Sequence, residues 1–250
     1  MGQHSILIDV GRCIGCHACT TACKVKNDTP EGVFWTRVST YEQGTFPDAR
    51  PYSAPLSRCM HCEYPACASA CPVGALSKSE EGAITYDPNR CVGCRYCMVA
   101  CPFHTPKLDW DSVISSIQKC QLCADRLAAD LEPACTSVCP TAALSFGERA
   151  SLLSEARARI QESGGQYVNH VYGENEVGGT SLLYISPVAF ENLGFSTLGD
   201  EPVTELSEKV AVIGTPAIAG VAAVVLAGLY WVTKRRERGK AASRSVEESE

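Results

Sequence analysis

"CVGCRYCMVACP", residues Cys91–Pro102, contains four cysteines within eleven positions and ends in proline. The chain has 250 residues and 16 cysteines, all of which lie between Cys13 and Cys139. They fall into four groups of four, which we call the first to fourth quartets. In chain order these are Cys13, Cys16, Cys19 and Cys23; Cys59, Cys62, Cys67 and Cys71; Cys91, Cys94, Cys97 and Cys101; and Cys120, Cys123, Cys135 and Cys139.

The spacing within the quartets indicates iron–sulfur ligation. Counted as intervening residues, the first and third quartets are spaced 2-2-3, the second 2-4-3 and the fourth 2-11-3. In a C-x2-C-x2-C loop, three thiolates hold three corners of one iron–sulfur cube, and the more distant fourth cysteine binds a different cube. That fourth cysteine lies about one helical turn further on and points away. The last three quartets end in Cys-Pro, where proline turns the chain away from a helix.

Zinc, disulfides and nucleic-acid binding are the alternatives. C-x2-C pairs also build structural zinc sites, and the 2-11-3 quartet taken alone resembles a zinc ribbon. Disulfide frameworks belong mainly to short secreted chains, whereas this sequence opens "MGQHSILIDV" without an apolar signal stretch. The formal net charge is −6, and no basic stripe with interleaved aromatic residues precedes residue 234, so nucleic-acid binding has little support.

Two internal repeats support the cluster interpretation. "LIDVGRCIGC" (7–16) matches "TYDPNRCVGC" (85–94) at Asp, Arg and Cys-x-Gly-Cys, and "CPVGAL" (71–76) matches "CPTAAL" (139–144). Each segment that leads into a cysteine loop predicts a short strand. Gly15 and Gly93 suit positions where the backbone comes close to sulfide and offers its N–H, and they equally suit a plain tight turn.

The first 147 residues resemble the four-cluster ferredoxin-type electron-transfer subunit of respiratory molybdenum and nickel–iron oxidoreductases. The resemblance is carried by "CIGCHACTTAC", "CMHCEYPACASACP", "CVGCRYCMVACPF" and "CQLCADRLAADLEPACTSVCPTAAL". The pattern is most similar to the beta subunit of membrane-bound formate dehydrogenase and to the iron–sulfur subunit of membrane-bound uptake hydrogenase. This resemblance implies an α+β fold of tandem, duplicated bacterial ferredoxin-like domains.

The same resemblance implies four [4Fe-4S] clusters and the ligands of each. In that family the first quartet shares clusters with the fourth, and the second with the third. We name the implied ligand groups sets A to D. Set A is Cys13, Cys16, Cys19 and Cys139; set B is Cys120, Cys123, Cys135 and Cys23; set C is Cys59, Cys62, Cys67 and Cys101; set D is Cys91, Cys94, Cys97 and Cys71.

Residues 148–209 follow the predicted cluster domain (1–147) as a helix and strand extension that packs on the core or on a partner. Leu152, Leu153, Ala156 and Ile160 have near-helical spacing, and Gly164 and Gly165 are expected to end that helix. Residues 171–186 predict a glycine turn and a strand, either at the surface or in a subunit contact.

Residues 210–232 form 23 consecutive positions without a charge, which is long enough for a transmembrane helix. Tyr230 and Trp231 lie where interfacial aromatic residues are expected. "KRRERGK" follows, and residues 233–250 are predicted to be a basic flank and a disordered cytoplasmic tail. The positive-inside rule places the C-terminus in the cytoplasm and the cluster domain on the periplasmic side of the inner membrane.

The predicted function is electron relay without a substrate site, because no catalytic constellation is visible. The resemblance implies two partners: a large molybdenum/tungsten or nickel–iron catalytic subunit, and an integral-membrane b-type cytochrome that reacts with quinone. It also implies export in folded form with a partner that carries a twin-arginine signal, and the leaderless start favours the formate dehydrogenase type. The alternatives are the same role in an uptake hydrogenase, a freestanding membrane-tethered ferredoxin, and a zinc-rich module.

Several charged and imidazole side chains adjoin the predicted ligands. The basic ones are expected to face solvent rather than to offset thiolate charge, and His17 or His61 is a candidate modulator of a cluster potential. The basic residues are Arg12, Lys24, Arg90, Arg95 and Lys119.

Overall fold

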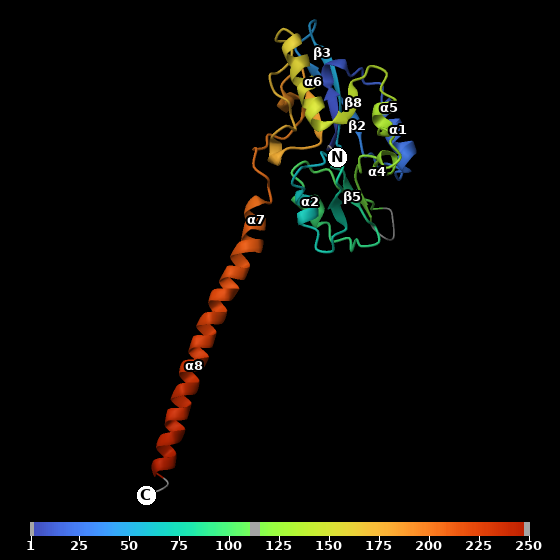
Figure 1. Cartoon of the computed structure of the whole chain (residues 1–250). Coiled ribbons are helices and arrows are strands. Elements are labelled where there is room, and N and C mark those ends of the chain that lie inside the picture. Colours follow the sequence, from blue (N-terminus) through green and yellow to red (C-terminus); the bar gives the residue numbers. More distant parts are fainter. Residues whose placement is uncertain (1–2, 111–115, 248–250) are drawn as a thin grey trace. The chain divides into compact units, whose positions relative to one another are not determined.

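The computed structural model describes residues 3–110 and 116–247, which form two compact units, Met1–Val203 and Thr204–Glu250 (Figure 1). Each unit is described by itself. The strands are β1 His4–Asp9, β2 Arg37–Gln43, β3 Arg50–Leu56, β4 Leu76–Lys78, β5 Ile84–Tyr86, β6 Lys107–Leu108, β7 Ile117–Gln118, β8 Leu144–Glu148 and β9 Leu182–Ile185. The helices are α1 Ala18–Asn27, α2 Ala66–Ser69, α3 Tyr96–Ala100, α4 Ala124–Leu127, α5 Ala134–Ser137, α6 Arg149–Glu162, α7 Glu205–Lys209 and α8 Thr215–Glu247.

A three-stranded sheet with the order β8-β1-β9 forms the centre of the first unit. β1 runs antiparallel to β8 and parallel to β9, so that Ile8 lies opposite both Leu144 and Tyr184. Successive side chains of a strand point to opposite faces. One face packs against α6 through Leu7, Leu183 and Ile185, while Ile6, Ile8, Leu182 and Tyr184 face the cysteine-bearing segments.

The helix predicted after the cluster region is confirmed as α6, which buries Leu152, Ala156 and Ile160 against the sheet. It ends shortly before Gly164, whose φ of +62° suits glycine.

The prediction of a surface strand or subunit contact within residues 171–186 is wrong. β9 is completely buried, with its four residues at most 1% exposed. The uninterrupted apolar run "LLYI" is typical of a strand covered on both faces, because such strands lose the alternation of a half-exposed one. Gly173 is required beside it, since a Cβ there would lie 2.2 Å from the carbonyl oxygen of Leu182. This strand of the extension is therefore part of the core.

The two-stranded sheet of β4 and β5 has the same local pairing as β8 and β1 of the central sheet. Leu76 of β4 lies opposite Tyr86 of β5, as Leu144 lies opposite Ile8. In each case the residue after the pair, Asp87 or Asp9, donates its N–H over 2.8 Å to the carbonyl oxygen of an alanine. β1 and β5 lead into the first and third quartets, and β8 and β4 follow the fourth and second. The two pairings therefore bring the first quartet next to the fourth, and the second next to the third.

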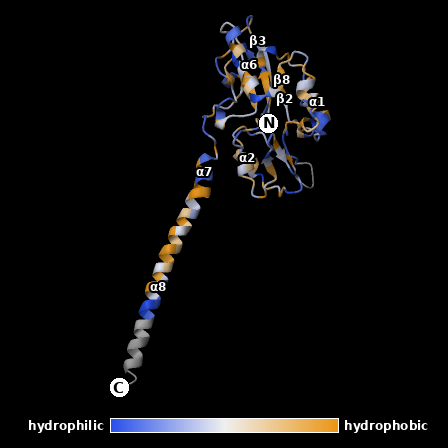
Figure 2. Ribbon diagram, viewed as in Figure 1, coloured by the Kyte–Doolittle hydropathy of each residue, from blue (hydrophilic) through white to orange (hydrophobic). Residues whose placement is uncertain are grey.

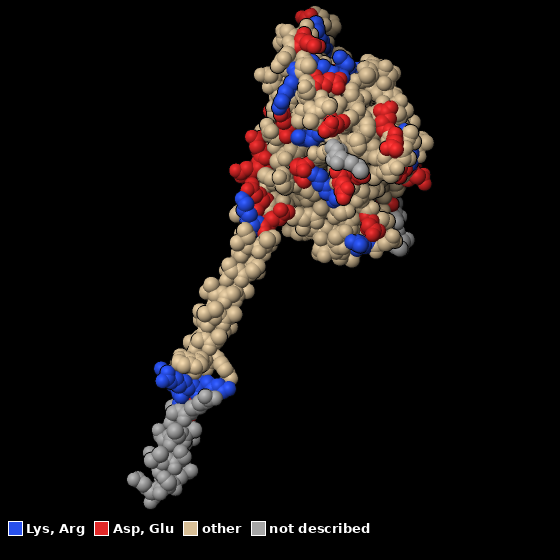
Figure 3. Space-filling model, viewed as in Figure 1, with Lys and Arg blue, Asp and Glu red and all other residues tan. Residues whose placement is uncertain are grey.

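The second unit is a continuous helical segment formed by α7, a π-helical turn at Val210–Gly214, and α8. Its stretch Glu205–Glu237 is long and apolar enough to cross a membrane, by length and composition, and it contains the predicted span 210–232 (Figure 2). The π-helical turn precedes Pro216, which has no N–H to donate. Figure 3 shows the uncharged length of this helix and the basic side chains at its end.

The basic end of the helix is organised around aromatic rings. Lys234 lies over the ring of Tyr230 and Arg235 over that of Trp231, with distances to the ring centroids of 5.1 and 5.3 Å. Residues 233–247 are helical, including residues 241–247 of the tail, for which disorder is predicted, and their Lys, Arg, Glu and Ala residues are good helix formers. Residues 248–250 of the predicted tail lie outside the described residues.

If β9 belongs to the core, Leu183→Ala should lower the free energy of unfolding by about 2–5 kcal/mol, as buried leucine truncations do. The measurement is anaerobic guanidinium unfolding of the full chain in detergent, followed by circular dichroism. Leu131→Ala is the control, because Leu131 is 50% exposed and its truncation should change stability by less than about 0.5 kcal/mol. Equal effects of the two substitutions would contradict the buried position of β9.

Candidate iron–sulfur cluster sites

The same backbone feature opens all four quartets. The residue two positions after the first cysteine has a positive φ, which turns its N–H toward that cysteine. The four residues are Gly15 (+70°), His61 (+50°), Gly93 (+67°) and Leu122 (+56°). Gly93 and Leu122 donate to the Sγ atoms of Cys91 and Cys120 over 3.4 Å, and Gly15 and His61 bond in the same way to Cys13 and Cys59. Inward-pointing N–H groups of this kind favour an anionic ligand.

The fourth cysteine of each quartet marks the end of a helix where proline follows. α2, α3 and α5 end one or two residues before Cys71, Cys101 and Cys139, whereas α1, whose Cys23 is followed by lysine, continues to Asn27. Three residues after each Cys-Pro cysteine, an N–H donates back to the cysteine carbonyl over 3.1–3.3 Å. The predicted effect of proline is confirmed.

Helix packing brings the quartets together in pairs: α1 packs against α5, and α2 against α3. The thiols then influence one another. Burial, followed by the neighbouring sulfur of Cys120, raises the pKa of Cys23, with further contributions from Cys135 and Cys123. These four cysteines are set B.

In sets A, C and D, the cysteines of one set likewise raise the pKa of a thiol in that set. Burial raises the pKa of Cys62, and the thiols that add to the effect are Cys59, Cys101 and Cys67, the rest of set C. Burial raises the pKa of Cys97 to about 11, with Cys91, Cys94 and Cys71 of set D contributing. For Cys13, burial is again the largest cause of a raised pKa, and Cys139 and Cys16 of set A add to it.

Two small cavities coincide with two of these groups. One is lined by all four cysteines of set B, and the other by all four of set D. Thiols with raised pKa values are neutral near pH 7, and a bound metal stabilises the thiolate instead. Both the enclosed spaces and the inward N–H donors therefore fit an iron–sulfur cluster.

The thiols of successive sets also interact electrostatically in a fixed order. Cys19 of set A interacts with Cys135 of set B, Cys120 of set B with Cys59 of set C, and Cys67 of set C with Cys97 of set D. The end sets each contain one exposed cysteine, Cys16 in set A and Cys94 in set D. Set B, by contrast, is buried throughout.

Two buried cations lie among the sulfurs. Arg58 is 3% exposed, and its Nη2 donates to Cys135 Sγ over 2.9 Å. Lys119 is 2% exposed and donates to the carbonyl oxygens of Ile84 and, over 3.0 Å, Cys120. The expectation that Lys119 faces solvent is therefore wrong. Sequence reasoning missed Arg58, although it directly precedes Cys59, as Lys119 precedes Cys120.

Known sequences share these features. A family model described as a 4Fe-4S dicluster domain matches residues 50–149, and one described as a 4Fe-4S binding domain matches residues 11–26. The chain is 34% identical over 254 residues to the hydrogenase-2 operon protein HybA of Escherichia coli O157:H7, an alignment that covers 84% of this chain and 77% of HybA. The chain belongs to the family of 4Fe-4S electron-transfer subunits of respiratory oxidoreductases.

Two further relatives of this subunit family serve different enzymes. The thiosulfate reductase electron transfer subunit PhsB of Salmonella typhi is 46% identical over 147 residues, covering 58% of this chain and 76% of PhsB. The iron-sulfur subunit of nitrate-inducible formate dehydrogenase of Escherichia coli K12 is 36% identical over 200 residues, covering 72% of this chain and 66% of that subunit. The chain binds [4Fe-4S] clusters, and the matched region 50–149 includes the fourth quartet, for which zinc was the alternative.

His61 packs as a neutral side chain in this electron-transfer subunit. It is fully buried, and its Nδ1 accepts the N–H of Ile84 over 2.8 Å. Burial, with the charges of Lys119 and Arg58, holds its pKa well below the usual range. His17 instead has a φ of +59° directly before α1. Of the two, His61 is the one enclosed among the sulfurs.

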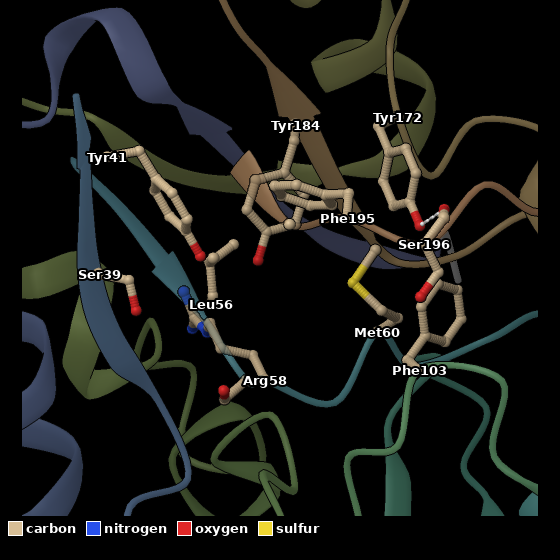
Figure 4. A pocket seen from close by; sticks show the side chains of 12 residues that line it. Ser39, Tyr41, Leu56, Arg58, Met60, Phe103, Tyr172, Tyr184, Phe195 and Ser196 are labelled. Carbon is tan, nitrogen blue, oxygen red and sulfur yellow. Dashed lines mark hydrogen bonds between the residues drawn. The ribbon is translucent and has the colours of Figure 1, made fainter. Parts of the chain in front are cut away.

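A larger cavity of about 230 Å³ lies beside the cluster region (Figure 4). Tyr41, Tyr172, Tyr184 and Phe195 line it, and Arg58 is drawn at its wall. The Tyr184 hydroxyl donates to the carbonyl oxygen of Pro55, and that of Tyr172 to Ser196. The described residues of its lining supply no carboxylate, imidazole or thiol.

Metal analysis tests the cluster interpretation directly. Anaerobically purified full-length protein should contain about sixteen iron atoms and about sixteen acid-labile sulfides per chain, as expected for four [4Fe-4S] clusters. The measurement is elemental and sulfide analysis, with low-temperature electron paramagnetic resonance (EPR) of the reduced protein. Stoichiometric zinc, or no EPR signal on reduction, would contradict the prediction.

Proposed function

We propose that this chain carries four [4Fe-4S] clusters on sets A to D and relays electrons between a catalytic subunit and a membrane b-type cytochrome that reacts with quinone. The observation that carries the proposal is the ordered electrostatic interaction of the sets, through the pairs Cys19–Cys135, Cys120–Cys59 and Cys67–Cys97. Such a series gives electrons a path through the protein with an exposed cysteine at either end.

The bound clusters supply one-electron redox chemistry, and the protein's own residues prepare their surroundings. The thiols of each set would hold one cluster, with one ligand in each case coming from a different quartet. Backbone N–H groups such as those of Gly93 and Leu122 donate to ligand sulfur, which favours the more negative, reduced state. The sheet β8-β1-β9 and the hairpin β2–β3 pack in one apolar cluster with Cys19 of set A and Cys135 of set B.

A duplicated ferredoxin-like arrangement is part of this proposal. It is supported by the equal register of β1–β8 and β4–β5, and by the left-handed residue that opens every quartet. In functional terms, residues 1–147 bind clusters, residues 148–203 complete the first unit, residues 210–232 of the helical segment that begins at Glu205 anchor the chain, and residues 233–250 form the basic flank and tail.

The catalytic partner is inferred from the relatives. HybA and the formate dehydrogenase subunit belong by name to a hydrogenase operon and to a formate dehydrogenase. A large molybdenum/tungsten or nickel–iron subunit is therefore the proposed electron donor or acceptor. The two relatives have similar identities to this chain, so the choice of formate dehydrogenase over hydrogenase stays a prediction.

Replacing Cys97 by serine tests the relay. Cys97 is buried in set D, so Cys97→Ser should remove or convert one cluster and block quinone-linked turnover of the assembled membrane complex. Reduction of an artificial dye by the catalytic partner should continue, because that reaction bypasses the relay. The measurements are EPR and parallel quinone and dye assays.

Cys71→Ser is the matched variant, because Cys71 is far from Cys97 in sequence but belongs to the same set. It should alter the same EPR signal as Cys97→Ser, whereas Cys62→Ser should alter another. Normal quinone reduction by the Cys97→Ser complex would contradict the relay. A signal shared by Cys71→Ser and Cys62→Ser would contradict the ligand sets.

The orientation in the inner membrane is a further prediction. Because Lys234, Arg235 and Arg236 follow the apolar helix, green fluorescent protein fused to the C-terminus should fold in the cytoplasm and fluoresce. Protease added to spheroplasts should digest residues 3–203 and leave the fusion intact. Digestion of the fusion by external protease would reverse the orientation.

A further inference from the structure

A basic residue directly precedes the first cysteine of every quartet. The four residues are Arg12, Arg58, Arg90 and Lys119. They occupy the same position relative to the cysteine loops. Two of them are exposed and paired with aspartate, whereas the other two are buried.

The arginines before the 2-2-3 quartets are paired with aspartate. Arg12 lies 3.3 Å from Oδ2 of Asp9, and Arg90 lies 3.5 Å from Oδ2 of Asp87. The other oxygen of each aspartate accepts the N–H two residues further on, from Gly11 and Asn89. Both arginine side chains are also well exposed, at 48% and 66%. Their charge is therefore compensated and screened.

Arg58 and Lys119 precede the other two quartets and are buried. Among the described residues, no carboxylate lies within ion-pairing distance of either. The Nε and Nη1 atoms of Arg58 are buried without a hydrogen-bond partner. A buried cation costs free energy unless negative charge is close by. The partner of Arg58 is instead the sulfur of a predicted cluster ligand, Cys135, and Lys119 donates to the carbonyl oxygens of Ile84 and Cys120.

Both cations contact residues of set B. Arg58 donates to Cys135 Sγ over 2.9 Å, and Lys119 precedes Cys120 and donates to its carbonyl oxygen over 3.0 Å. The charge of Arg58 also lowers the pKa of Cys23 and Cys120 of this set, against the larger effect of burial. The basic residue that precedes the loop of set D is Arg90, which is exposed and paired with Asp87.

We propose that Arg58 and Lys119 are fixed, uncompensated charges that raise the reduction potential of the cluster on set B and leave that of set D unaffected. The inference rests on the proposed function, since it needs the clusters to be present. Reduction adds one electron to a cluster, and a nearby positive charge stabilises the added negative charge. No bond in the chain forms or breaks, and a chemical titrant supplies the electron. Both side chains act on the cluster through their charge, and neither is a catalytic residue.

The test is an EPR-monitored redox titration of the full-length protein in detergent. Arg58→Gln should decrease the equilibrium constant for reduction of the cluster on set B at least tenfold, which corresponds to 59 mV for a one-electron couple. Lys119→Gln should do the same for that cluster, which is identified as the one lost in Cys123→Ser. The cluster lost in Cys97→Ser identifies set D, and neither substitution should move its potential.

Arg90→Gln is the matched control, because Arg90 occupies the same position before Cys91 but is exposed and paired with Asp87. It should change every equilibrium constant less than threefold. The proposal is overturned if Arg58→Gln and Lys119→Gln shift no potential more than Arg90→Gln does. Absence of clusters from the unmodified protein would instead contradict the proposed function.

Charge-preserving variants decide the case in which the glutamine variants lose their clusters. Arg58→Lys and Lys119→Arg should keep all clusters, with equilibrium constants within threefold of the unmodified protein. That result supports a role for the charge. Loss of clusters in these variants as well would assign the two side chains to packing and overturn the proposal.

Discussion

Thiolate sulfur brings negative charge into a protein interior that solvates it poorly, and the first unit is built around this constraint. Most of the cysteines are buried, and burial raises the pKa of thiols such as Cys23 and Cys120. Two kinds of group offset the cost: backbone N–H donors turned inward by a left-handed residue, and buried cations. The same left-handed conformation recurs at Gly15, His61, Gly93 and Leu122, because in each quartet the sulfur of the first cysteine accepts an N–H from this residue.

Strand pairing explains why cysteines far apart in the sequence meet. β1 and β8 are joined over five residue pairs, which holds the entry to the first quartet beside the exit from the fourth. β4 and β5 do the same for the second and third quartets with three pairs. Because α1 then packs on α5 and α2 on α3, each quartet reaches the cysteines of its partner. Ordinary sheet register thus determines which thiols are neighbours.

The sequence predicted what depends on short-range spacing. The cysteine loops, the helix ends at Cys-Pro, α6 and the apolar helix all follow from local patterns, and the structure contains them. It did not predict that His61 and Leu122 adopt the conformation of the equivalent glycines, because a non-glycine residue with positive φ is uncommon. The burial of β9 and Arg58 depends on packing between segments more than 60 residues apart, such as Ile6 with Leu182, and Lys119 contacts Ile84, 35 residues away. A single sequence carries no direct sign of such contacts.

The half of the cluster region that contains sets A and B is held by more contacts with the rest of the first unit than the half that contains sets C and D. Around Asp9, Arg159 and Tyr167 complete a buried network, at distances of 3.1 and 2.6 Å. The equivalent Asp87 is 46% exposed and is contacted by its own arginine. A two-stranded sheet such as β4–β5 is marginal by itself. Binding energy from a metal site contributes directly to folding, so the half that holds sets C and D depends more on its clusters for stability than the half enclosed by β9 and α6.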